Sequence, residues 1–256
     1  MKLLDSPFSP FARKVRMVLE HKGLAFDTID ALLKSNHDVL HAANSRLEVP
    51  ALIDGDITVI NSADIVAYLE HRYPQQPVYP EEPAERVTAR AWERTADTLI
   101  DAALINVSYW NWAERTDTRP DGMLEAAQDE MTRVYDRLER DLAGREFVCG
   151  ALSIADIALF PHLMAARGVG LAFSREAHRN VAGWLARMRH LPIAQADVER
   201  TRAYVARIKD VGIERTRLFW RGDRIEWLFV HGFHDWFYRE IAEGRVLWPG
   251  PALPPA

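Results

Sequence analysis

Cysteine is nearly absent from this sequence, which carries only Cys149 among its 256 residues. A single cysteine excludes an intrachain disulfide and suits a reducing compartment such as the cytoplasm. No apolar run approaches the roughly 20 residues that a membrane-spanning helix needs. The first residues already read as a strand, which leaves no room for a signal peptide. We therefore expect a cytoplasmic protein without a disulfide or a membrane segment.

The sequence also lacks an excess of basic charge. Its formal net charge is −5 at pH 7, which argues against general affinity for nucleic acids. Hydrophobic residues make up 48% and charged residues 27%, as in an ordinary globular protein. A chain of this length can form one large domain or two smaller ones. We find neither an internal repeat nor a low-complexity segment.

The chain opens with a pattern that predicts a strand, a turn and a helix. The apolar residues 2–4 indicate the strand. Ser9 occupies an N-cap position and Pro10 the first helical position. Apolar residues then recur at helical spacing at Phe11, Val15, Val18 and Leu19. Free amide donors at this helix end could hold an anion such as a thiolate, although Ser9 could also be a plain helix cap.

Further elements follow in the order expected of a small mixed sheet. Residues 24–29 predict a second strand, parallel to the first because a helix connects the two. Val49 and Pro50 precede a hairpin whose strands, 51–53 and 58–60, flank Asp54-Gly55-Asp56. A helix should then begin at Ser62 and end near residue 73.

The second half of the chain predicts only helices. Four prolines between residues 74 and 83 mark a linker. Ser153 and Asp156 form a capping box with a structural role at the start of one helix. In the tail, apolar residues with helical spacing predict one amphipathic helix over 225–243, docked on the helical part. The alternatives are a lid on the substrate pocket or an oligomer contact. The other helices are expected at about 84–114, 121–143, 153–168, 177–190 and 193–208.

Three separated motifs, at Ser9, at Val49-Pro50 and at Ser62, occur in the order found in glutathione transferases. The opening resembles most closely the omega class, whose first helix begins Cys-Pro-Phe-Ala. In this sequence Ser9 replaces that cysteine. The resemblance covers about residues 1–200. It implies an α+β thioredoxin-like domain (1–76), an all-helical domain (84–208) and a C-terminal extension (209–256).

The resemblance also implies glutathione as co-substrate and a role for each motif. Ser9 would donate a hydrogen bond to the glutathione thiolate, with no metal required, and Ser6 is the alternative donor. Val49 and a cis Pro50 would bind the cysteinyl part through backbone groups. Ser62 would receive the γ-glutamyl carboxylate and Asn61 the amino group.

A second substrate would bind between the domains. The expected pocket residues are aromatic and suit an apolar electrophile: Phe11, Tyr109, Trp110 and Trp112. An equally good interpretation is that two of these four pack in the core. The resemblance further implies a homodimer.

The leading hypothesis is a transferase, with a role in detoxification, in which the glutathione thiolate attacks an apolar electrophile. One alternative is a glutathione-dependent isomerase or dehalogenase that uses the same site. The other is a non-catalytic binding or regulatory protein that retains the fold. Asn61 stands where the family usually has Glu, Asp or Gln, and Leu47 where many relatives have Gly. Both departures, together with the unusual tail, favour the non-catalytic alternative.

Overall fold

The computed structural model describes residues 1–251, and its N-terminal part is a mixed four-stranded sheet. The strand order is β2-β1-β3-β4. β1 and β2 are parallel, whereas β1 pairs with β3, and β3 with β4, in antiparallel fashion. The second strand begins three residues later than predicted. The strands are β1 (Lys2–Asp5), β2 (Asp27–Asp30), β3 (Ala51–Asp54) and β4 (Ile57–Ile60).

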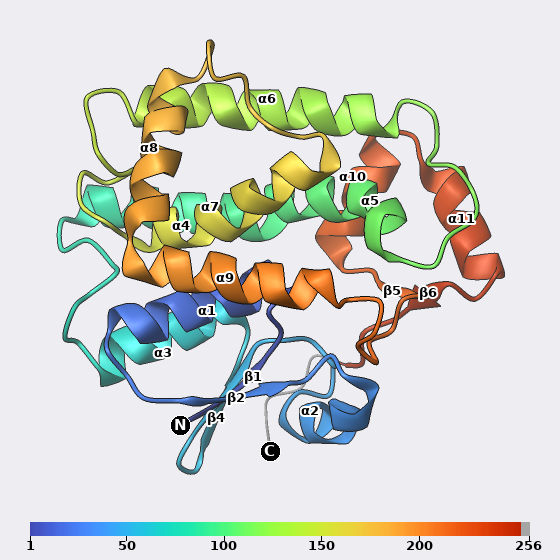
Figure 1. Cartoon of the computed structure of the whole chain (residues 1–256), viewed down its shortest axis with the longest axis horizontal. Coiled ribbons are helices and arrows are strands. Elements are labelled where there is room, and N and C mark those ends of the chain that lie inside the picture. The colour runs from blue at the N-terminus through green and yellow to red at the C-terminus, as the bar shows by residue number, and fades with distance from the viewer. Residues whose placement is uncertain (252–256) are drawn as a thin grey trace.

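Helices cover both faces of this sheet (Figure 1). α1 (Pro10–His21) and α3 (Ser62–Arg72) lie between the sheet and the helical domain. The short η1 (Lys34–Asn36) and α2 (His37–Ala43) lie at the other face. Side chains alternate along β1, so that Leu3 packs in the large core and Leu4 in the small core beneath α2. The predicted thioredoxin-like arrangement is confirmed.

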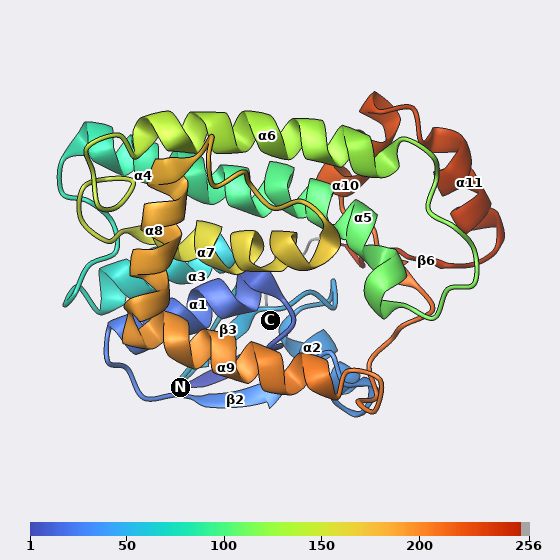
Figure 2. The ribbon, with the colours of Figure 1, turned by 45° about the horizontal axis from the view of Figure 1, so that its top comes forward.

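The helical domain stacks on α1 and α3 (Figure 2). The expected first long helix consists of two α-helices joined by the π-helical turn η2 (Ala96–Ile100). Asp156 caps α7 as predicted by accepting a hydrogen bond from the Ser153 amide at 3.0 Å. The helices are α4 (Pro83–Thr95), α5 (Asp101–Trp112), α6 (Met123–Asp141), α7 (Ile154–Ala166), the 3-10 turn η3 (Arg167–Val169), α8 (Arg179–His190) and α9 (Pro192–Ala206).

Buried ion pairs fix α1 against the helical domain. The Arg13 guanidinium binds the Asp197 carboxylate of α9, with Nη2 and Oδ2 2.7 Å apart. The Lys14 ammonium lies 3.0 Å from a Glu93 carboxylate oxygen of α4. All four side chains are almost fully buried, so each charge needs its partner. These pairs hold the first turn of α1 at the boundary between the domains.

The C-terminal extension differs from the prediction of one helix over 225–243. It forms α10 (Gly222–Val230) and α11 (His234–Ala242). Gly232 separates them with a φ of +80°, a conformation that glycine adopts without steric cost. The amides of Gly232 and Phe233 donate to the carbonyls of Phe229 and Leu228, which satisfies the end of α10. The prediction was wrong because the apolar spacing continues across this stop signal.

The extension nevertheless docks on the helical domain, as predicted. The ring centroid of buried Trp236 lies 5.4 Å from that of Trp110. Arg115, from the loop after α5, pairs with buried Glu240 at 2.6 Å. Two short parallel strands, β5 (Leu218–Phe219) and β6 (Val246–Leu247), form a ribbon beside α5. This ribbon brings the extension to the boundary between the domains.

Candidate active site

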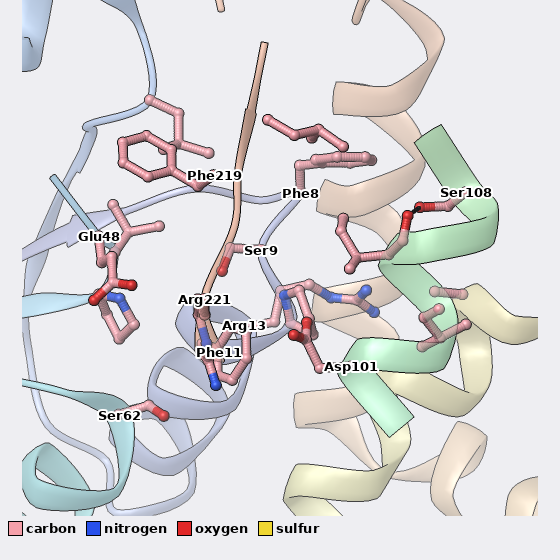
Figure 3. Close-up of a pocket in the computed structure, with 18 of the residues that line it drawn as sticks. Phe8, Ser9, Phe11, Arg13, Glu48, Ser62, Asp101, Ser108, Phe219 and Arg221 are labelled. Atoms are coloured by element: carbon pink, nitrogen blue, oxygen red, sulfur yellow. Dashed lines mark hydrogen bonds between the residues drawn. The ribbon is translucent and has the colours of Figure 1, made fainter. Parts of the chain in front are cut away.

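A cavity of about 1210 Å³ lies where the two domains and the extension meet. One wall is built from the N-terminal domain, a second from the helical domain, mainly α5 and α9, and a third from residues of the extension. Figure 3 shows side chains from all these segments around the same space. Of the predicted site residues, the cavity is lined by Ser9, Phe11, Val49, Pro50, Asn61, Ser62 and Trp112.

Ser9 is the N-cap residue of α1 and follows the turn after β1. Its Oγ accepts a long hydrogen bond of 3.5 Å from the Ala12 amide, and its own amide donates to the Ser6 carbonyl. The hydroxyl hydrogen therefore stays available to a ligand in the cavity. Ser6, the alternative donor, is fully buried, and its Oγ accepts from the Phe8 amide at 3.2 Å. Ser6 does not line the cavity.

The Val49-Pro50 peptide bond is cis, as the resemblance implies. Within residues 1–251, the backbone N–H and C=O of Val49 form no hydrogen bond. They can therefore pair with an extended peptide lying in the cavity. Leu47 has a φ of +57°, a conformation that favours glycine.

Asn61 and Ser62 form the start of α3. Asn61, with a φ of +68°, is the N-cap residue, and its side chain accepts from the Ala63 amide at 3.3 Å. Ser62 is the first helical residue, so its amide belongs to the free donors of the helix end. Its hydroxyl donates to Asp97 Oδ2 at 3.5 Å. Asp97 Oδ1 is buried and has no hydrogen-bond partner in the described chain.

The α5 wall presents one face of the helix to the cavity. The lining residues follow helical spacing: Asp101, Leu104, Ile105, Ser108, Asn111 and Trp112. Trp112 also packs edge-on against Phe8, with ring centroids 5.5 Å apart.

Tyr109 and Trp110 do not line the cavity but pack in the core, so that the alternative interpretation, in which two of the four aromatic residues are core residues, is the one that holds. Tyr109 is fully buried, and its hydroxyl donates to the Thr216 carbonyl at 2.8 Å. The Trp110 ring lies against Trp236 and beneath the Arg115 guanidinium. Both residues point away from the cavity face of α5 and bind the extension instead. Their aromatic side chains suggested that both residues line the pocket, but their positions on α5 place them outside the helix face that lines the cavity.

The sequence indicated that the extension could reach the pocket, but not which of its residues form the wall. Phe219, Arg221 and Leu247 line the cavity from the ribbon and from the start of α10. Arg224 holds this segment on α5 by binding the Asp101 carboxylate at 2.8 and 3.1 Å. Burial alone would raise the pKa of Asp101, but the Arg224 guanidinium lowers it below its usual range. The short apolar and aromatic run Leu218-Phe219-Trp220 was the signal that could have revealed a strand.

The described residues contain no group of three or more histidine, cysteine or acidic side chains that could hold a metal ion. No helix within residues 1–251 is long and apolar enough to cross a membrane.

Comparisons with known proteins agree on one family. Models of the glutathione S-transferase N-terminal and C-terminal domains match residues 3–77 and 112–187. "Glutathione S-transferase U6" of Arabidopsis thaliana is 26% identical over 151 residues, 59% of this chain and 64% of that protein. The "Uncharacterized GST-like protein YibF" of Escherichia coli is 29% identical over 75% of this chain and 90% of its own. The chain thus spans just under two thirds of the plant relative.

A solved glutathione S-transferase of Methylobacillus flagellatus, crystallised with glutathione bound, is 27% identical. It matches 77% of this chain and 98% of its own, with a TM-score of 0.66. Both family domains are therefore present in the order that the fold shows, and the chain belongs to the glutathione transferase family.

Proposed function

We propose that this protein is a glutathione transferase that activates the glutathione thiol for attack on an apolar electrophile. The observation that supports this most directly is the cavity itself. One wall carries the Ser9 hydroxyl, the free backbone groups of Val49 and the start of α3. The facing α5 wall offers apolar surface at Leu104, Ile105 and Trp112. A polar peptide and an apolar second substrate can thus occupy the same cavity.

Ser9 would favour the thiolate without giving up its proton. A free thiol has a pKa near 8.5, and lowering it by two units takes roughly 2.7 kcal/mol. One hydrogen bond to a charged group contributes about 1.5–3 kcal/mol, and a helix N-terminus about 0.3–1 kcal/mol. Ser9 caps α1 and offers both interactions at the same point. The thiol proton leaves to solvent, and the sulfur forms a C–S bond with the electrophile as a halide leaves, an epoxide C–O bond opens or a conjugated C=C π bond is broken.

The start of α3 would bind the γ-glutamyl end of glutathione. The Ser62 hydroxyl and amide suit its carboxylate, because free helix-end amides bind anions. Asn61 is uncharged, and the neighbouring Asp97 carboxylate is already paired with Lys14. The Asn61 side-chain oxygen, which accepts one hydrogen bond from the Ala63 amide, would therefore be the acceptor for the glutathione ammonium. The departure at Asn61 is therefore compatible with glutathione binding.

Cys149 does not contribute to the proposed chemistry. It lies outside the cavity lining, and burial raises the pKa of its thiol to about 11. A thiol with this pKa is almost fully protonated near neutral pH and reacts poorly with disulfides. The sulfur that reacts is that of glutathione.

Calorimetric titration with glutathione, followed by a conjugation assay with an aromatic chloride, tests the proposal. We expect binding and formation of the thioether. Binding without turnover on a panel of halides, epoxides, enones and quinones would favour the non-catalytic alternative. Absence of binding at millimolar glutathione would refute both enzyme hypotheses. Light scattering would test the homodimer that we propose with this function.

Replacing Ser9 by alanine is expected to lower turnover by about 10- to 100-fold, because one donor to the sulfur is lost. Glutathione affinity should change little, because the contacts at Val49 and Ser62 remain. Ser9→Cys should instead gain disulfide-exchange activity. The measurements are kcat, the glutathione Kd and the pH–rate profile. An unchanged profile in Ser9→Ala would reduce Ser9 to a helix cap.

A further inference from the structure

The segment that connects β5 to α10 runs beside the N-terminal end of α1 (Figure 3). Residues alternate in direction along this extended segment. Leu218, Phe219 and Arg221 line the cavity, whereas Trp220 is buried on the other side against Trp236 and Phe237. The extended backbone of Arg221, with φ −86° and ψ 164°, continues this alternation to the start of α10. The packing of Trp220 therefore fixes which way Arg221 points.

Arg221 is held in place by one edge of its guanidinium only. Its Nη2 donates to the Asp97 carbonyl and to Asp223 Oδ2, each at 3.0 Å. Its Cζ lies 4.7 Å from the centroid of the Phe11 ring. Nε and Nη1 form no hydrogen bond within residues 1–251, and neither is buried. These donors remain available to a ligand in the cavity.

The guanidinium keeps its charge in this position. Burial disfavours the charged form, but Asp101, Asp223 and Glu48 outweigh it and raise the pKa of Arg221 above its usual value. Most of the neighbouring carboxylates have a partner of their own. Asp101 binds Arg224, Glu48 binds Arg46 and Asp97 binds Lys14. Only Asp223 is bound to Arg221 itself, so a cation with free donors faces the cavity.

We propose that Arg221 is a catalytic residue that stabilises the glutathione thiolate together with Ser9. Phe11 belongs to the first turn of α1, which Ser9 caps, so the guanidinium lies against the same turn as the Ser9 hydroxyl. A guanidinium next to an anionic group lowers the pKa of that group by about 1–3 units. The extension thus takes part in the reaction and does not merely cover the pocket. This inference rests on the proposed function.

The thiolate of enzyme-bound glutathione absorbs in the ultraviolet, and its absorbance against pH gives the pKa of the bound thiol. In Arg221→Met we expect this pKa to rise by about one unit or more, since methionine keeps an apolar stem on Phe11 but no charge. Turnover should fall near neutral pH and recover in alkali, where the thiol ionises unaided. Arg221→Lys should restore part of the shift. Arg239→Met removes an exposed arginine of the same extension and is the matched control.

Each outcome decides between distinct explanations. If the wild type binds no glutathione, the proposed function fails, whatever Arg221 does. If Arg221→Met binds glutathione and its thiol pKa equals that of the wild type, the present inference is wrong. The inference is also wrong if the thiol pKa is unchanged and only the KM of a carboxylate-bearing electrophile rises, because Arg221 would then bind the second substrate. Melting temperatures confirm that each variant is folded.

Discussion

Replacing Asp156 by alanine should lower the free energy of unfolding by about 3 kcal/mol or more, because several buried donors lose their acceptor at once. Asp156 Oδ1 accepts from the Val148 amide at 3.0 Å and from Trp184 Nε1 at 2.8 Å. Oδ2 accepts from the amide and the hydroxyl of Ser153, both at 3.0 Å. This carboxylate thus connects the start of α7, the preceding loop and α8. Denaturant unfolding measures the loss.

The matched control is Asp129→Ala on the exposed face of α6. Alanine favours helix there and removes no partner, so stability should change by less than about 0.5 kcal/mol. If Asp156→Ala were as stable as this control, the carboxylate would be dispensable and the capping box would have no structural role. Glutathione binding should follow folding in both variants, since neither residue lines the cavity.

Truncation after Asp210 should produce a protein that unfolds at lower temperature, aggregates and loses activity. Trp220, Trp227, Trp236 and Phe237 are buried in the docked extension. Each large side chain stabilises by about 1.5–3 kcal/mol when buried, and the surface they cover would become exposed. The cavity would also lose its third wall. Unchanged melting, solubility and turnover would show that the extension is dispensable.

A pair of tryptophans tests the same packing without removing the segment. Trp236 is 5% exposed and Trp248 is 56% exposed. Trp236→Ala should cost about 3–5 kcal/mol, as expected for a large side chain removed from a core. Trp248→Ala should cost far less, because most of its surface already meets solvent. Equal losses in calorimetric unfolding would mean that the extension does not dock through Trp236.

Local signals were sufficient for the elements that the fold shares with its relatives. Ser9-Pro10 begins α1, and the hairpin around Gly55 connects β3 and β4, as the sequence predicts. Each of these elements depends on caps and turns within a few residues. Long-range contacts could not be predicted from such local signals. The pairing of Arg13 with Asp197 joins residues on α1 and α9, and no local pattern announces it.

The candidate site likewise contains residues that local motifs predict and residues that depend on long-range packing. The N-terminal residues of the site come from helix starts and the Val49-Pro50 turn, which sequence motifs reveal. To predict the residues of the α5 wall, one must know which face of the helix lines the cavity. The face that carries Tyr109 and Trp110 is instead covered by the extension. Arg221 can be assigned to the cavity only once Trp220 is known to be buried, because neighbouring residues of an extended segment point to opposite sides. Aromatic composition suggested a pocket but could not orient it.

The parallel ribbon of β5 and β6 has a consequence for protein synthesis. Leu247 of β6 lines the cavity, and β5 is paired with β6 at Leu218 and Phe219. The cavity wall therefore cannot form on a nascent chain until residue 247 has left the ribosome. Synthesis proceeds at about 5–20 residues per second, so the N-terminal domain emerges many seconds before its site is complete. Until then the side of the cavity that Phe219 and Leu247 line stays open, and a chain stalled in its last fifth would hold a folded N-terminal domain without a complete cavity.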